Sequence, residues 1–329
     1  MKVCIYGAGA IGGYLGARLH GGGHDVTLIA RGAHLDAIRR NGLTLRTPHD
    51  TRSVQIHATD RPAQAEPQEA VFVTVKASGL EPVAASLAPL LTPRTPVVFI
   101  GNGLPWWYFL ERRDEEVKIA GLSPVADAML RVVRPENVVG GVMGIPCSVL
   151  EPGVVQVQDE SAKMGGLVLG AASARSNQQA AELARRLSES GVPARAVDDI
   201  RPEVWKKLAA NVGSGPLSVL TQAPLNVLFR NPYCCRLRML VQREIIAIAA
   251  AMGCHIEYDV KKSLQAAASV RHLPSMLQDL LAGRPLETGV LLDAPLNLAR
   301  HKGVPAPILE MLAELTKTRA LARSDQPQH

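Results

Sequence analysis

The segment "EVWKKLAAN" (residues 203–211) carries residue types at a spacing that suits carbonyl chemistry. Lys207 and Asn211 are four residues apart and share one face of a predicted helix, whereas Lys206 lies about 100° around it. An ammonium on that face can donate a proton to an oxygen that gains negative charge, which is typically worth about 10²- to 10⁴-fold in rate. The simpler alternative is a surface ion pair between Glu203 and Lys207, worth only about a few tenths of a kcal/mol.

A second chemical segment is "GAGAIGG", which places Gly7, Gly9 and Gly12 in a GxGxxG pattern directly after an apolar strand. The first glycine permits a tight turn, the second lets a diphosphate approach the backbone, and the third lets helix and strand pack closely. Ala10 and Ile11 lie in the first helical turn, where backbone N–H groups are free to bind phosphate. The pattern predicts a dinucleotide site, and the alternative is a glycine-rich turn without a ligand.

The second strand indicates which dinucleotide is bound. NAD sites place an acidic residue about twenty positions after the glycines, where it accepts from the ribose hydroxyl. The stretch "TLIARGAH" has no acid and offers Arg31 just past the strand. A guanidinium there can pair with a 2′-phosphate, so the prediction is NADP(H). The alternative is that Arg31 is a solvated loop residue.

The elements that must position these residues alternate between strand and helix in the first half of the chain. Apolar runs such as "KVCIYGAG", "DVTLIAR", Ala70–Ala77 and "TPVVFIGNG" are separated by helical segments. This alternation predicts a Rossmann-type, doubly wound α/β sheet that is covered on both faces. The segments "VVGGVMGIPCSVLEPGVVQVQ" and "GGLVLGAA" predict further strands. Asn102 follows a strand directly, at the edge where parallel sheets bind ligands, although Asn-Gly is also a common turn signal.

From about residue 199 the pattern becomes helical, with glycine and proline stops. The predicted domains are residues 1–195, a dinucleotide-binding domain, residues 196–320, an all-helical domain, and residues 321–329, a polar tail. The apolar segment "LRMLVQREIIAIAAAMG" is either core or a homodimer face.

Composition narrows the class of protein. The chain has 329 residues, 47% hydrophobic but only 4% aromatic, which predicts aliphatic cores in two domains. The net charge of +6 comes from scattered basic residues without interleaved aromatics, so a nucleic-acid partner is not expected. Five cysteines without a CxxC indicate neither a disulfide framework nor a metal site. No apolar run is long enough to span a membrane, and the expected location is the cytoplasm.

Taken together, these motifs resemble the ketopantoate reductase (2-dehydropantoate 2-reductase) family. The resemblance rests on "MKVCIYGAGAIGGYLGARL", "LIARG", "VTVKA", "GNG", "EVWKKLAANVGSGPL" and "SMLQDLLAGRPLETG", which follow the family's order over residues 1 to about 290. It implies NADPH-dependent reduction of a 2-keto acid, with substrate held in a cleft between a Rossmann domain and a helical domain.

The resemblance also implies a role for each matching residue. It makes Lys207 the general acid, Asn211 and Ser275 substrate ligands, and Lys76 a cofactor contact. It places Asn102 beside both nicotinamide and substrate, and Glu287 at the edge of both the cofactor site and the catalytic site.

Four positions depart from the family pattern. Gly215 stands where the family has a second substrate-binding asparagine, and Leu225 stands where it has another, with Asn226 one residue away. Trp106 and Trp107 follow "GNG", where they either pack the strand against its helix or line the pocket mouth. A site without those amides binds substrates that lack the matching hydroxyl at little cost, so the substrate is ketopantoate or another 2-keto or 2-hydroxy acid. A non-catalytic NADP-binding sensor or scaffold is the alternative from another class.

Overall fold

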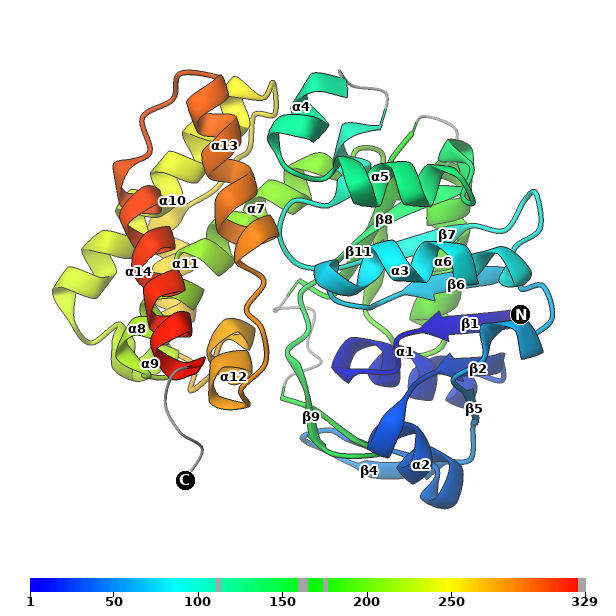
Figure 1. Ribbon diagram of the computed structural model, residues 1–329. Coiled ribbons are helices and arrows are strands. Elements are labelled where there is room, and N and C mark those ends of the chain that lie inside the picture. Colours follow the sequence, from blue (N-terminus) through cyan, green and yellow to red (C-terminus); the bar gives the residue numbers. More distant parts are fainter. Residues whose placement is uncertain (111–113, 159–164, 174–176, 325–329) are drawn as a thin grey trace. The chain divides into compact units, whose positions relative to one another are not determined.

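The computed structural model describes residues 1–110, 114–158, 165–173 and 177–324, and they form two compact units (Figure 1). The sheet unit consists of residues 1–101 and 124–200, and the helical unit of residues 102–123 and 201–329. No helix among the described residues is long and apolar enough to cross a membrane.

An eight-stranded sheet forms the centre of the sheet unit, in the order β12-β11-β8-β7-β6-β1-β2-β5. Neighbouring strands are parallel except β8 and β11. The strands are β1 (Lys2–Tyr6), β2 (Asp25–Ile29), β5 (His57–Thr59), β6 (Ala70–Val73), β7 (Val97–Ile100), β8 (Val138–Met143), β11 (Leu167–Ala171) and β12 (Ala194–Val197). Every residue of β6 and β7 is buried, as expected for strands covered on both faces. The Rossmann-type sheet predicted from the sequence is confirmed.

Helices connect these strands: α1 (Ala10–Gly21), α2 (Gly32–Asn41), α3 (Leu80–Leu87), α5 (Ser123–Leu130) and α6 (Asn177–Glu189), with short 3₁₀ turns η1 (Pro62–Gln64), η2 (Ala77–Gly79), η3 (Ala88–Leu90) and η5 (Pro135–Asn137). Strand β6 ends at Val73, short of the predicted Ala77, and η2 begins there. The crossover from β1 leads to β2 on one side, and the later crossover from β5 returns to β6 on the other side of β1. This reversal of strand order is where doubly wound sheets bind nucleotides.

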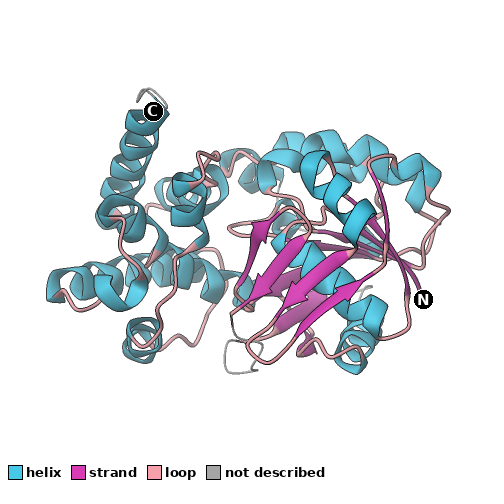
Figure 2. Cartoon of the chain, turned by 90° about the horizontal axis from the view of Figure 1, so that it is seen from below, coloured by secondary structure: helices cyan, strands magenta, loops and turns pink. Residues whose placement is uncertain are grey.

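Helix α1 contacts strands of two sheets. Figure 2 shows the strands of the sheet unit in magenta and the helices that pack against them in cyan. The second sheet has the order β4-β3-β10-β9, formed by β4 (Thr51–Val54), β3 (Leu43–Arg46), β10 (Val154–Val157) and β9 (Cys147–Glu151). Glycines let α1 approach both sheets, because a Cβ on Gly16 would lie 2.6 Å from Leu28 in β2, and one on Gly13 would lie 2.7 Å from Val155 in β10.

The helical unit confirms the predicted all-helical region. Its helices are α7 (Arg201–Val212), α8 (Gly215–Thr221), α9 (Leu225–Leu228), α10 (Pro232–Ala251), α11 (Val260–Ala268), α12 (Ser275–Leu281), the π-helix η7 (Gly289–Asp293), α13 (Ala294–His301) and α14 (Pro307–Ser324). In α10, Val241, Ile245 and Ile248 are fully buried at helical spacing, so this apolar face is core. Residues 321–324 of the predicted tail belong to α14, and residues 325–329 lie outside the described residues.

Residues 102–123 contribute η4 (Trp106–Phe109) and α4 (Asp114–Ile119) to the helical unit. Trp106 and Trp107 are only 1% and 2% exposed, so both indoles are buried. The indole Nε1 of Trp205 donates to the Tyr108 hydroxyl at 2.9 Å, and Arg201 donates to the Tyr108 carbonyl at 3.1 Å. These contacts fasten η4 to α7.

Candidate active site

The glycine-rich loop between β1 and α1 has the shape of a phosphate cradle. A Cβ on Gly12 would overlap the carbonyl oxygen of Gly7 and would lie 2.6 Å from Thr74 Oγ1, so only glycine fits there. A Cβ on Gly9, by contrast, would find no described atom within 4 Å. Packing within the protein therefore explains the glycine at position 12 but not the one at position 9, where the open space suits the approach of a ligand.

The N-terminus of α1 is polarised for an anion. None of the described side chains caps this helix end, and its first turn contains no acidic residue. The N–H groups of the first turn, which includes Ala10, Ile11 and Gly12, have no partner inside the helix. These N–H groups lie at the positive end of the helix dipole, where a diphosphate binds favourably. The residues present thus fit a dinucleotide cofactor.

Arg31 and Lys76 lie at the carboxyl ends of the two strands that flank β1. Arg31 is the residue before α2, and Lys76 is the residue before η2. Both side chains are exposed, and within the described ranges Arg31 forms no ion pair. The sheet order β6-β1-β2 therefore brings Lys76, the glycine loop and Arg31 to one edge of the sheet.

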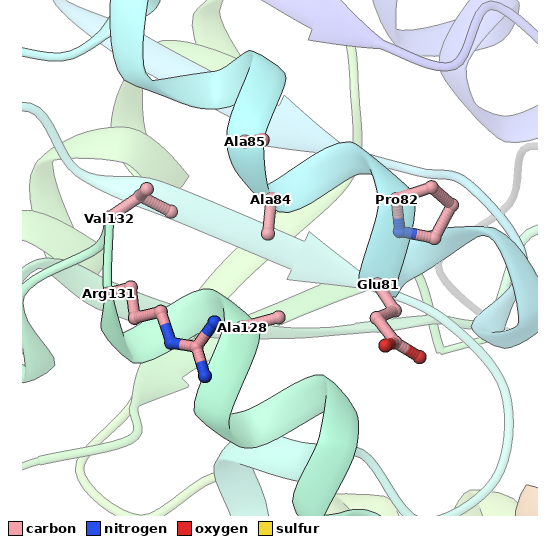
Figure 3. Close-up of a pocket in the computed structure, with 7 residues that line it drawn as sticks. All are labelled: Glu81, Pro82, Ala84, Ala85, Ala128, Arg131 and Val132. Atoms are coloured by element: carbon pink, nitrogen blue, oxygen red, sulfur yellow. The ribbon is translucent and has the colours of Figure 1, made fainter.

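A depression of about 420 Å³ elsewhere on the sheet unit contains none of the predicted site residues. It lies beside α3 and α5, and Figure 3 shows that its lining includes the apolar residues Ala84 and Val132 and the charged residues Glu81 and Arg131.

In the helical unit, Lys207 and Asn211 lie four residues apart on α7, and both are half-buried. Lys206 forms an ion pair with Glu203 at 3.0 Å. Glu203 thus forms an ion pair with the lysine that lies three residues after it.

Two amide side chains link α7 to Glu287. Asn211 Nδ2 donates to Asn102 Oδ1 at 3.3 Å, and Asn102 Nδ2 donates to Glu287 Oε2 at 3.4 Å. Because the carboxylate only accepts, it orients the Asn102 amide, which then presents its oxygen to Asn211. Three predicted site residues that are far apart in the chain thus form one hydrogen-bonded row.

Gly103 makes this row possible. Its φ of 78° lies in the left-handed region that favours glycine. A Cβ at this position would lie 2.5 Å from the Val290 carbonyl oxygen, in the π-helix η7. Leu104 N–H donates to the same carbonyl at 2.9 Å, which holds the loop against η7. Single-turn π-helices occur frequently at functional sites, and this one begins two residues after Glu287.

A buried polar network supports the C-terminal end of α7. Ser214 Oγ donates to the Ala210 carbonyl at 3.0 Å, and Ser214 N–H donates to the Asn211 carbonyl at 3.1 Å. Arg238, only 2% exposed, donates to Ser214 Oγ, and burial lowers the pKa of its guanidinium. Its positive charge lies at the negative end of the α7 dipole, a favourable position. The hydrogen bonds of Ser214 and Arg238 therefore hold the end of α7 that carries Asn211 in place.

The segment 272–276 lies next to this face of α7 and α8. Burial, and after it the charge of Lys207, lowers the pKa of His272, so this imidazole is a neighbour of the predicted general acid. Sequence reasoning missed His272, because no motif marks it. Ser275 is the exposed first residue of α12, and no described contact joins it to Asn211.

The space beside Gly215 is occupied by Met276. A Cβ on Gly215 would lie 3.5 Å from both Cβ and Sδ of Met276, which is itself 4% exposed. Leu225 is buried as well, and the half-buried Asn226 has a side-chain oxygen without a hydrogen-bond partner among the described residues. An apolar thioether thus stands where the resemblance led us to look for an amide.

A glycine-rich Rossmann loop and a lysine–asparagine helix face together define a class, the dinucleotide-dependent oxidoreductases. Residues 3–173 match the family model described as "Ketopantoate reductase PanE/ApbA", and residues 199–320 match its C-terminal model. The chain therefore belongs to the ketopantoate reductase family, and it is an oxidoreductase that acts on CH–OH groups.

Individual relatives agree with this assignment. The chain is 33% identical to a 2-dehydropantoate 2-reductase from Mesorhizobium japonicum, over 98% of this chain and 99% of that one. A ketopantoate reductase candidate from Ralstonia solanacearum has a crystal structure with a TM-score of 0.86 and 33% identity, covering 98% of both chains. A D-mandelate dehydrogenase bound to NADH and anilino(oxo)acetate has a TM-score of 0.84 at 23% identity, covering 98% of this chain and 100% of that one, and shares the fold.

Proposed function

We propose that the protein is an NADPH-dependent reductase of a 2-keto acid of the ketopantoate type. The observation that carries the proposal is the row Asn211–Asn102–Glu287 beside Lys207 on α7. A bound nicotinamide cofactor would supply the hydride. The glycine loop, Arg31 and Lys76 would bind this cofactor. Its relatives named 2-dehydropantoate 2-reductase support this reaction.

The residues of the helical unit would neutralise the charge that develops on the substrate oxygen and would orient the substrate. As the carbonyl is reduced, its oxygen gains negative charge, and the Lys207 ammonium gives up one N–H proton to form the O–H bond of the product. Lysine is left neutral and regains a proton from solvent. Asn211 and Asn102 have amide groups suited to orient the substrate, and Ser275 would assist them. Glu287 keeps the Asn102 amide in one orientation.

Arg31 is the basis for choosing NADPH over NADH. It is exposed at the end of β2, where a 2′-phosphate is recognised in this fold, and no acid stands at the equivalent ribose position. A guanidinium can bind the phosphate with two parallel hydrogen bonds, which gives both affinity and selectivity.

A second candidate substrate is a 2-keto acid with an apolar side chain in place of the ketopantoate hydroxyl. The packing of Met276 against Gly215 favours it, because this surface offers no hydrogen bond to a hydroxyl. A buried hydroxyl without a partner costs about 1–3 kcal/mol, which is about fivefold to about 150-fold in affinity.

The test is NADPH oxidation with ketopantoate and a panel of 2-keto acids of increasing side-chain size, for the wild type and for Lys207→Ala. We expect turnover in the wild type and a loss of at least about a hundredfold in kcat in the variant. Lys206→Ala, which removes only the ion pair with Glu203, is the matched control and should keep wild-type kcat. An unchanged kcat in Lys207→Ala would overturn the assignment of the general acid.

A further inference from the structure

His34 joins three segments of the sheet unit that are distant in sequence. It is the third residue of α2, and its ring is half-buried. Its Nε2 lies 2.7 Å from the carbonyl oxygen of Ala8 in the glycine loop. Its Nδ1 accepts from the backbone N–H of Gly153, at the turn between β9 and β10, at 3.0 Å. The imidazole is thus a bridge between the glycine loop and the second sheet.

These two contacts select one form of the ring. The Gly153 N–H can only donate, so Nδ1 must carry a lone pair. The Nε2 then carries the hydrogen and donates it to the Ala8 carbonyl. An imidazolium has hydrogen on both nitrogens and would place a donor against the Gly153 donor. Only the neutral ring with its hydrogen on Nε2 therefore satisfies both contacts.

The Ala8 carbonyl matters because it shares a peptide plane with the Gly9 N–H. In a planar trans peptide the C=O and the following N–H point in opposite directions. The carbonyls on either side of it have other partners, since Gly7 accepts from Thr74 Oγ1 at 2.6 Å and Gly9 accepts from Gly13 N–H at 2.7 Å. His34 thus fixes the direction of the Gly9 N–H, beside the position where a Cβ would find open space.

We propose that His34 is a positioning residue of the dinucleotide site: its neutral ring aims the Ala8–Gly9 peptide so that the Gly9 N–H donates to the cofactor diphosphate. The proposal rests on the proposed function, because it requires the glycine loop to bind the cofactor. The same helix begins immediately after Arg31, so the bridge also ties the glycine loop to the residue expected to read the 2′-phosphate.

The ring resists protonation in this position. Burial lowers the pKa of His34, and the hydrogen bond to the Ala8 carbonyl opposes this shift. The glycine loop that contacts the ring has no ionisable side chain. The charged residues of the other segments that contact the ring are all exposed: Arg31, Asp36, Arg39 and Arg40 at α2, and Glu151 in β9. Acidification below the ordinary histidine range therefore breaks the bridge at Gly153.

The test measures NADPH affinity by calorimetry at about pH 8 and about pH 5.5. We expect His34→Ala to raise the Kd at about pH 8 by at least about tenfold, with kcat at saturating NADPH within about twofold of wild type. In His34→Gln the amide can replace both contacts without titrating, so its Kd should stay within about threefold of wild type at about pH 8. Its Kd should also rise less on acidification.

The 2′-phosphate of NADPH titrates in the same range, but it does so equally in wild type and His34→Gln, so the comparison between them isolates the ring. His24→Gln is the matched control: His24 is a half-buried histidine that contacts the N-terminus, and its substitution should leave the Kd unchanged. Nitrogen-15 NMR of the unaltered protein reports the tautomer and requires no variant.

Hydrogen on Nδ1, or equal NADPH affinity in wild type and His34→Ala, would overturn the role of His34 while leaving the reductase assignment intact. Failure of the wild type to bind NADPH would overturn both.

Discussion

Gly103→Ala tests whether the contact between the Asn102 loop and the π-helix holds the helical unit together. Alanine in the left-handed region costs about 1–2 kcal/mol. Its Cβ would lie 2.5 Å from the Val290 carbonyl oxygen, and overpacking of this kind costs about 1–3 kcal/mol more. The sum of about 2–5 kcal/mol corresponds to a fall in Tm of roughly 5–15 °C for a unit of this size.

Intrinsic fluorescence is the appropriate assay, because all three tryptophans, at positions 106, 107 and 205, lie in the helical unit. Its melting curve therefore reports this unit alone. We also expect a lower kcat, since a displaced loop moves Asn102 away from Glu287 and Asn211. Gly21→Ala, at the end of α1 away from the glycine loop, is the control, because a Cβ there meets no described atom within 4 Å and its φ is not in the left-handed region. A Tm and kcat for Gly103→Ala equal to those of the control would refute the reasoning.

Three further outcomes are expected. Arg31→Gln should raise the Kd for NADPH by at least about tenfold while leaving that for NADH within about twofold, measured by calorimetry with Arg40→Gln as control; equal losses for both cofactors would contradict the 2′-phosphate role. Met276→Ala combined with Gly215→Asn should shift the kcat/KM ratio toward ketopantoate and away from apolar 2-keto acids, and an unmoved ratio would remove this surface from substrate recognition. The pKa of His272 is lowered in the folded state, so its contribution to the free energy of unfolding is present above the ordinary histidine pKa and is lost as pH falls below it. The Tm of His272→Gln should therefore fall less than that of the wild type between about pH 7 and about pH 5.5. Equal falls in Tm would exclude a contribution of the His272 ring to this pH dependence.

Local patterns were sufficient to predict the elements that carry several of the candidate site residues. The glycine motif needs only a strand, a turn and a helix, and Lys207 and Asn211 need only helical spacing. Apolar runs such as β6 and β7 likewise predicted the buried parallel sheet. In each case the signal lies within one short stretch of the chain, which is where periodicity is most informative.

Other features depend on contacts that no local pattern encodes. Asn102 and Glu287 are 185 positions apart, and Asn102 reaches Glu287 because residues 102–123 pack with the helical unit. The π-helix has no sequence signature that distinguishes it from an ordinary helix start. No motif in the sequence singles out His34, and its two partners are 26 and 119 positions away.

The placement of α1 between two sheets has a consequence for how the chain is made. The face of α1 at Gly13 is covered by Val155, in a sheet where β3 pairs with β10 about a hundred residues later. On the ribosome, the N-terminal helix therefore emerges long before the strand that covers it, and its apolar surface stays uncovered for several seconds at ordinary elongation rates of about 5–20 residues per second. Truncated or stalled chains that end before residue 154 expose this surface permanently, which makes them substrates for chaperones and proteases rather than partial enzymes.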